Sequence, residues 1–125
     1  MRLTRLPGEY AVARADPAAP VPPGILDGAG FRTVARTDEE LSVVAPVQDI
    51  HAMDKVDGGW SCFKLHGPFE FDEIGIINGL SAPLKERKIG VFVVSTFDTD
   101  YILIKQADAD AAAAAWVDAG HEVLD

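Results

Sequence analysis

The sequence predicts an α+β fold in which 125 residues form two related units. Short segments with a period of two, typical of half-buried strands, alternate with helical or crossing segments. An acidic turn between two apolar runs occurs twice, and the two copies can be superimposed so that Asp98 lies over Asp38. Each unit therefore has the order strand, crossing, strand, strand, crossing, a split β-α-β pattern with helices on one face of an antiparallel sheet.

The composition excludes several classes of partner. There are 11 Lys and Arg residues against 20 Asp and Glu residues, so the net charge is -9. Nucleic acid and anionic membranes are bound mainly through clustered Lys and Arg, so neither is an expected partner. Cys62 is the single cysteine, which rules out an internal disulfide and a Cys-rich zinc site. With no apolar run of transmembrane length, we expect a cytoplasmic protein that does not enter a membrane.

The first half of the chain is expected to be mostly β-structure. Residues 9–15 alternate small or apolar with polar side chains, as a strand does. Residues 17–30 are rich in proline, which excludes a regular helix there. Residues 31–35 and 41–45 flank an acidic turn and predict a hairpin. The sequence Asp57-Gly58-Gly59 predicts a turn before the next strand.

The second half contains the predicted helices. Residues 60–65 predict a strand, and residues 72–88 predict a helix with Asp72 as its N-cap. Pro83 lies inside this helix, and the carbonyl group that it would leave without a donor belongs to Gly79. We therefore expect a helix that bends between these two residues and continues past them.

The remaining elements complete the second unit. Residues 89–95 and 101–105 predict a second hairpin. Asp108 or Asp110 is expected to cap an alanine-rich helix that stops at Gly120, and residues 121–124 predict a closing edge strand. Residues 59–65 can also be superimposed on residues 9–15. The predicted units are thus 1–58 and 59–125, and the first has lost most of its first helix.

Three separated motifs in the second unit resemble the ACT domain, a small ligand-binding module of amino-acid metabolism. They are Gly67-Pro68, the pattern Asp72, Gly75, Ile76 and Ile77, and the hairpin from Ser95 to Tyr101. The resemblance is strong over residues 60–125. It is closest to the stand-alone tandem-ACT group that includes the arginine-sensing CASTOR proteins, and the opening residues and first hairpin look like that group's first unit.

The resemblance implies two ferredoxin-like βαββαβ units that pair side by side, with an amino acid bound at an interface between units. It implies a regulatory, allosteric sensor that forms a homodimer, with no catalytic activity and no cofactor. Because the first unit lacks the usual first helix, one site per chain is expected, around the second unit.

A free amino acid carries a carboxylate beside an ammonium group, so its pocket needs donors for an anion next to an anionic group. The N-terminus of the helix that begins at Asp72 supplies the donors, and Gly75 lets the ligand approach the backbone. Asp98 or Asp100 supplies the anionic group. The predicted ligand-binding residues are His66, Gly67, Asp72, Ile74, Gly75, Ile76, Ser95, Thr96, Phe97, Asp98 and Asp100.

Each of these residues has a structural alternative. Asp98-Thr99-Asp100 also fits a plain turn, and His66 also fits a solvated loop. Phe97 fits the core or an interface better than a ligand-stacking role. Cys62 fits a small buried hydrophobic residue, because about 13 Å of strand separates it from His66.

Two functions other than ligand binding are an interaction module and an enzyme. The strands that are apolar at consecutive positions also fit a ligand-free structural or protein-interaction module that dimerises through its sheets. An enzyme is disfavoured because no nucleophile has a base in reach, and no metal site is expected because the three histidines lack metal-ligand spacing.

Overall fold

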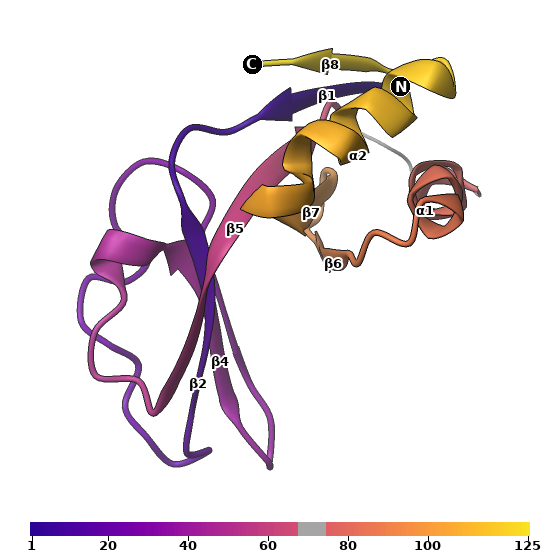
Figure 1. The fold of residues 1–125 in the computed structure, drawn as a ribbon. Helices are drawn as coiled ribbons and strands as arrows, with labels where there is room; N and C mark the ends of the chain where they lie inside the picture. Colours follow the sequence, from indigo (N-terminus) through magenta and orange to yellow (C-terminus); the bar gives the residue numbers. More distant parts are fainter. Residues whose placement is uncertain (68–74) are drawn as a thin grey trace. The chain divides into compact units, whose positions relative to one another are not determined.

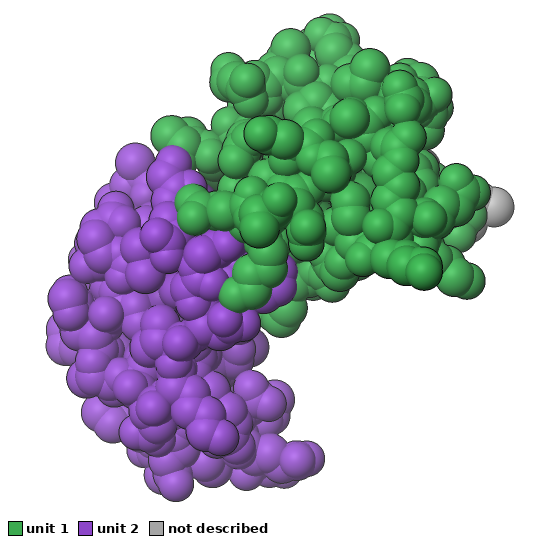
Figure 2. Space-filling model, in the orientation of Figure 1, with its two compact units in different colours: residues 1–7, 61–125 green, residues 8–60 purple. Residues whose placement is uncertain are grey.

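The computed structural model describes residues 1–67 and 75–125, which form two compact units (Figure 2). Unit 1 comprises residues 1–7 and 61–125, and unit 2 comprises residues 8–60. The chain thus divides between residues 60 and 61, slightly beyond the expected boundary. The first seven residues lie with the second half of the chain and not with the first.

Unit 2 is a four-stranded antiparallel sheet in the order β3-β4-β2-β5. Its strands are β2 (Tyr10–Ala15), β3 (Thr33–Arg36), β4 (Leu41–Pro46) and the first half of β5 (Lys55–Leu65). The predicted strand at residues 9–15 and the hairpin at 31–45 are confirmed. Residues 8–60 contain no α-helix, because the proline-rich segment is irregular and β4 is followed by a 3₁₀ turn, η1 (Val47–Asp49).

Small side chains explain how an irregular segment can cover this sheet. Ala11, Ala13 and Ala15 are buried on β2, and Ala13 pairs with Val43 on β4. Ile25, from the irregular segment, packs in a cluster with Val43. Because alanine rises little above the sheet, the chain can lie close to it and bury the face without the thickness of a helix.

The predicted turn at Asp57-Gly58-Gly59 is wrong, because these residues lie inside β5. Tyr10 pairs with Trp60 and Val12 pairs with Asp57, so β5 holds one extra residue between the two pairs. Gly59 has a φ of 76°, and its N–H donates to the Glu9 carboxylate at 2.7 Å. The glycines therefore form a β-bulge and do not reverse the chain.

Unit 1 contains both α-helices and a sheet in the order β6-β7-β5-β1-β8 (Figure 1). Its central part is the second half of β5. The other elements are β1 (Arg2–Arg5), α1 (Ile76–Glu86), β6 (Phe92–Ser95), β7 (Asp100–Lys105), α2 (Gln106–Asp118) and β8 (Glu122–Leu124).

The hairpin at residues 89–105 and the closing strand are confirmed, whereas β1 was not expected. β1 pairs antiparallel with β5 and parallel with β8. Its four residues include one apolar side chain, Leu3, which is too little for a period of two to be recognised.

Both helices of unit 1 cover the same face of its sheet. Trp116 of α2 is fully buried, its ring meets Phe63 edge to face at 5.0 Å, and its indole N–H donates to the Leu80 carbonyl of α1 at 2.9 Å. Leu103 and Cys62 point to the other face and are also fully buried. Burial on both faces is therefore confirmed for residues 102–104 of β7 but not for residues 91–94, which are half-buried in β6 and exposed at Val91. The buried core of the helical face is Leu3, Phe63, Leu65, Leu80, Leu84, Ile89, Ile102, Ile104, Ala109, Ala112, Ala115 and Trp116.

The prediction that α1 continues through its proline is confirmed, since Pro83 lies inside the helix. Pro83 has no N–H to donate to the Gly79 carbonyl. The His121 ring takes that role, with Nε2 at 3.3 Å from the Gly79 oxygen. α1 begins at Ile76, with Gly75 as the N-cap, and the predicted cap Asp72 lies outside the described residues.

α2 differs from the prediction at its start and agrees with it at its end. The helix begins at Gln106, so Asp108 and Asp110 lie inside it and the predicted cap is wrong. Asp108 is in the first turn, where the positive end of the helix dipole stabilises a carboxylate. Asp110 forms an ion pair with Arg5 at 3.1 Å. The stop at Gly120 is confirmed: its φ is 97° and its N–H donates to the Val117 carbonyl.

The two hairpins have the same turn. Arg36 pairs with Leu41 in the first hairpin, and Ser95 pairs with Asp100 in the second. In both turns a threonine hydroxyl and N–H bond to the residue three positions later: Thr37 with Glu40, and Thr96 with Thr99. Superimposing the turns therefore places Asp98 over Glu39 and not over Asp38, because the threonines set the turn and the acidic residues do not.

In the part of the chain that the structure describes, no helix is both long enough and apolar enough to cross a membrane.

The bulge in β5 leads to a first prediction. Replacing Gly59 by Ala should lower the free energy of unfolding by about 1–2 kcal/mol, because a residue with a Cβ resists a positive φ. Space is not the cause, since no atom lies within 4 Å of the added Cβ. Gly90→Ala is the matched control: its φ is not in the left-handed region and its surroundings are equally open. Urea unfolding followed by tryptophan fluorescence measures both, and equal losses would contradict the assignment of the bulge.

Candidate functional site

The predicted acidic hairpin is a tight turn with internal hydrogen bonds. The Ser95 hydroxyl donates to the Asp100 carboxylate. The Thr96 N–H and hydroxyl both donate to the Thr99 carbonyl, at 2.8 and 3.0 Å. Phe97 is 78% exposed at the tip, so of the two expected places, the core or an interface, it does not lie in the core. The turn thus presents Phe97 and Asp98 outward.

Thr99 attaches this hairpin to the end of β5. Its side chain is buried, and its hydroxyl donates to the Leu65 carbonyl at 2.6 Å. His66 and Gly67 follow directly and are both exposed. The structure therefore brings the hairpin and the predicted loop residues together.

β1 fixes the position of His66. The backbone N–H of His66 donates to the Arg2 carbonyl at 2.9 Å, and its ring Nε2 is hydrogen-bonded to the Thr4 hydroxyl. A histidine held on both its backbone and its ring is more ordered than a solvated loop residue. No pattern in the sequence indicates this, because β1 was not expected.

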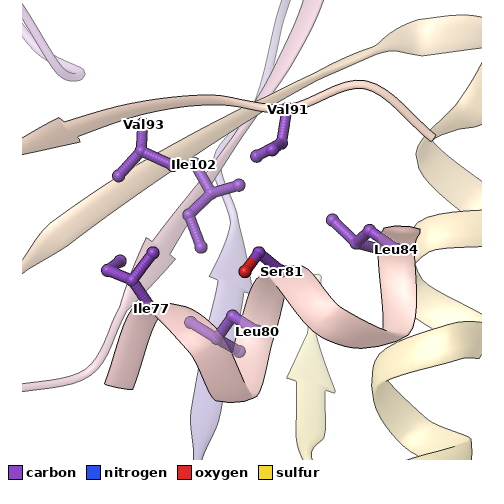
Figure 3. A pocket seen from close by; sticks show the side chains of 7 residues that line it. All are labelled: Ile77, Leu80, Ser81, Leu84, Val91, Val93 and Ile102. Atoms are coloured by element: carbon purple, nitrogen blue, oxygen red, sulfur yellow. The ribbon is translucent and has the colours of Figure 1, made fainter. Parts of the chain in front are cut away.

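The start of α1 is the third predicted part of the site. Gly75 has a φ of 80°, and its carbonyl accepts the Gly79 N–H at 2.8 Å. Ile76 packs against the core of unit 1. Ile77 faces Val93 and Ile102, and the pair Ser95–Asp100 follows further along the same strands (Figure 3). Asp72 and Ile74 lie outside the described residues.

A crevice between α1 and the strands is apolar and narrow. It has no room for a water molecule. The Ser81 hydroxyl is the one polar group among the described side chains that line it (Figure 3). This space is a gap in helix-on-sheet packing and not a pocket for an amino acid, which needs polar partners.

Two groups on the sheet face opposite the helices have raised pKa values. Burial raises the pKa of the Cys62 thiol to about 12. Burial also raises the pKa of Tyr101, and the nearby Cys62 and Asp98 raise it further. The Tyr101 hydroxyl therefore stays protonated, and Asp98 lies close enough to influence it.

This chemistry suits the binding of a cation better than catalysis. Asp98 and Asp100 provide carboxylates for an ammonium or guanidinium group, with the Thr96 hydroxyl beside them. The Cys62 thiol is buried and protonated at neutral pH, so it is no nucleophile. Within residues 1–67 and 75–125, no group of three or more His, Cys, Asp and Glu side chains is placed to hold a metal ion.

Three residues that shape the site are absent from the predicted ligand-binding residues: Thr4, Thr99 and Tyr101. Thr99 and Tyr101 were recognised only as part of the hairpin motif. A signal existed for the turn, because Thr37 and Thr96 start equivalent turns and both precede an acidic segment. No comparable signal marks Thr4, whose role depends on the pairing of β1 with β5.

Comparison with known families identifies the class of domain. Residues 55–115 match the ACT domain family, and residues 8–52 match a family model described as an N-terminal domain. ACT domains generally bind amino acids in regulatory proteins. The match begins at Lys55, where β5 starts, and includes the hairpin and both helix starts.

Solved structures identify the particular family. Protein Atu0741 from Agobacterium tumefaciens is 44% identical, with a TM-score of 0.89, and the alignment covers 98% of this chain and 91% of that one. This chain belongs to the same family as Atu0741. No curated protein matches it.

More distant structures share the fold alone. VC0802 from Vibrio cholerae, described as a possible transport protein of unknown function, is 16% identical over 94% of this chain and 88% of that one, with a TM-score of 0.70. The aspartate kinase of Clostridium acetobutylicum, described as an allosteric enzyme, is 11% identical, with a TM-score of 0.66. That alignment covers 94% of this chain and 33% of the kinase.

The anchor of the hairpin leads to a second prediction. Thr99→Val should lower the free energy of unfolding by about 1–3 kcal/mol, because it leaves the buried Leu65 carbonyl without its donor. Thr99→Ser keeps the hydroxyl and should retain most of the stability. Denaturant unfolding of the two variants checks this, and an equal loss in both would mean that the hydrogen bond is unimportant.

Cys62 leads to a third prediction, on pH dependence. The folded thiol has a pKa of about 12, against 9.0 for an unperturbed thiol, so between these values the unfolded state releases a proton that the folded state keeps. The contribution is fully present below pH 9 and is lost as the pH rises toward 12, at about 1.4 kcal/mol per pH unit. Urea unfolding from pH 8 upward should therefore show a steeper loss in the wild type than in Cys62→Ala. Parallel curves would contradict the burial of the thiol.

Proposed function

We propose that this protein is a non-catalytic, amino-acid-binding regulatory protein of the cytoplasm that works without a cofactor. The observation that carries the proposal is the acidic hairpin of an ACT domain, held at the end of β5 by the buried Thr99 hydroxyl. Because the turn is fixed by its own hydrogen bonds, Asp98 is presented at little entropic cost to a ligand.

The proposed ligand lies beside this hairpin at an interface between ACT units. Its ammonium or guanidinium group pairs with Asp98, and its carboxylate approaches the backbone N–H groups at the start of α1. A second copy of the chain provides the facing unit in a homodimer. β6 supports this arrangement, because among the described strands it pairs with β7 alone and its outer edge is open to another strand.

A tandem arrangement of ACT units, as in the group that includes the CASTOR proteins, is part of the proposal. Its support is that the order β3-β4-β2-β5 in unit 2 repeats the order of unit 1, except that β1 is inserted before β8. The equal turns at Thr37 and Thr96 support it further.

A second candidate function is a ligand-free interaction module. Phe97 favours it, because a phenyl ring that is 78% exposed at a hairpin tip offers apolar surface that an association would bury. This module would dimerise to the same extent with and without amino acids.

A fourth prediction tests ligand binding. A thermal-shift screen of the twenty amino acids at millimolar concentration should find at least one that stabilises the protein. At a hundredfold above the dissociation constant the gain is about 2.7 kcal/mol. Light scattering with that amino acid should show a change in mass that accompanies binding.

The matched variants for this test are Asp98→Asn and Glu39→Gln. Both remove one acid from the same position of an equivalent turn, since Glu39 lies over Asp98 when Thr37 is superimposed on Thr96. Asp98→Asn should weaken binding about tenfold or more by removing a charge-assisted bond, and Glu39→Gln should not. No stabilisation by any amino acid would support the interaction module, and equal weakening by both variants would exclude a site at this hairpin.

A further inference from the structure

An open groove runs along α1 from Asn78, in its first turn, to Lys88, just beyond its C-terminal end. Its volume is about 600 Å³, within the range of small-molecule sites. The start of α1 and the groove's lysines are separated by roughly the length of the helix, about 16 Å. The residues that line the groove are Asn78, Ser81, Ala82, Lys85, Lys88, Ile89, Gly90 and Val91.

Lys88 occupies a backbone position that usually belongs to glycine. Its φ is 59°, in the left-handed region. The Lys88 N–H donates to the Lys85 carbonyl and the Ile89 N–H donates to the Leu84 carbonyl, both at 3.0 Å, which is the Schellman pattern at a helix end. A residue with a Cβ is disfavoured in this conformation, so Lys88 stands where the backbone prefers glycine.

Gly90 is a glycine at a position that does not need one. Its φ is outside the left-handed region, and no atom lies within 4 Å of an added Cβ. Neither conformation nor close packing in the described structure requires a glycine, and Gly90 is one of the residues that line the groove. The chain therefore has a lysine at position 88, where the backbone favours glycine, and a glycine at position 90, where a side chain is allowed. Lys88 adds a positive charge to the groove, and Gly90 adds no side chain to it.

The charges in the groove are available to a ligand. Among the described residues, neither Lys85 nor Lys88 forms an ion pair, whereas the neighbouring Arg87 pairs with Asp118 at 2.7 Å. The carbonyls of Leu84 and Lys85 at the helix end already accept hydrogen bonds. In a chain of net charge -9, two lysines beside one groove form a local site for an anion.

We propose that this groove binds a small organic anion. The ammonium groups of Lys85 and Lys88 hold its carboxylate or phosphate group, and Ser81 offers a hydroxyl. An apolar part of the ligand rests on Ile89 and on Val91, whose side chain is 39% exposed. This site differs from the amino-acid site in the groups that hold the anion, because Lys85 and Lys88 lie at the C-terminal end of α1 and no residue of the hairpin from Ser95 to Tyr101 is among those that line the groove.

The test exchanges the two unusual residues in the double variant Lys88→Gly/Gly90→Lys. Composition and net charge are unchanged, the left-handed position receives its preferred glycine, and a long side chain is added at one of the positions that line the groove. The probes are citrate, isovalerate and inorganic phosphate at millimolar concentration, followed by backbone-amide NMR shifts. The wild type should show saturable shifts of residues 78–91 with at least one probe, while the exchange variant binds at least about tenfold more weakly and melts no lower.

The probes also distinguish the two kinds of anionic group. Saturation by citrate or isovalerate alone would assign a carboxylate ligand, and saturation by phosphate alone would assign a phosphate ligand. The double variant Lys85→Gln/Lys88→Gln removes both positive charges from the groove and should weaken binding of the anion. The double variant Lys55→Gln/Lys64→Gln removes two positive charges elsewhere in the chain and should leave binding unchanged. Absence of saturable shifts with all three probes, or equal binding by the exchange variant, would overturn the proposal. Either result leaves amino-acid binding at Asp98 unaffected, because that site is measured with Asp98→Asn.

Discussion

The pairing of β5 is the constraint on which both units depend. Its first half pairs with β2 in unit 2, and its second half pairs with β1 and β7 in unit 1. The bulge at Gly59 lies next to the point where the partners change, and the Glu9 carboxylate accepts the N–H that the bulge leaves out of the ladder. An extra residue exchanges the faces toward which all later side chains point. Beyond this point, Phe63 and Leu65 of β5 lie in the helix-covered core of unit 1.

Small side chains solve the problem of covering each sheet in two ways. In unit 2 the alanines of β2 let an irregular, proline-rich segment lie close to the sheet, so that Ile25 buries the face without a helix. In unit 1 the buried Ala109, Ala112 and Ala115 let α2 approach closely, and Trp116 fills the space toward α1. In both units, small side chains at the contact let the covering segment pack closely on the sheet. A proline-rich segment can therefore cover one sheet and a helix the other, although the strand orders are related.

The sequence predicts those parts of the fold that depend on local pattern. Strands with clear alternation, the hairpins, the Gly120 stop and a helix that tolerates Pro83 all agree with the structure, because periodicity and turn chemistry are local. The errors at Gly59 and β1 have a common cause: each depends on a partner distant in sequence, namely Glu9 for the bulge and β5 and β8 for β1. The error at the start of α2 has a local cause, because α2 follows β7 directly and no separate capping residue stands between them. In the site, the acidic tip was recognised from sequence. The Thr99 and Thr4 hydrogen bonds were not, because each joins residues that are far apart in the chain.

The two hairpins show which features of the candidate site are specific to it. Both turns begin with a threonine that makes the same bonds, and both are acidic, so neither the turn nor the acidity distinguishes unit 1. The differences lie at two positions. Glu40 stands where Thr99 stands, and Asp38 stands where Phe97 stands, so the second hairpin alone has a hydroxyl bound to the Leu65 carbonyl and an aromatic ring at its tip. What separates the second hairpin from the first is therefore its attachment to the end of β5 through Thr99 and the ring at its tip, and Asp98 is presented in that setting while Glu39 is not.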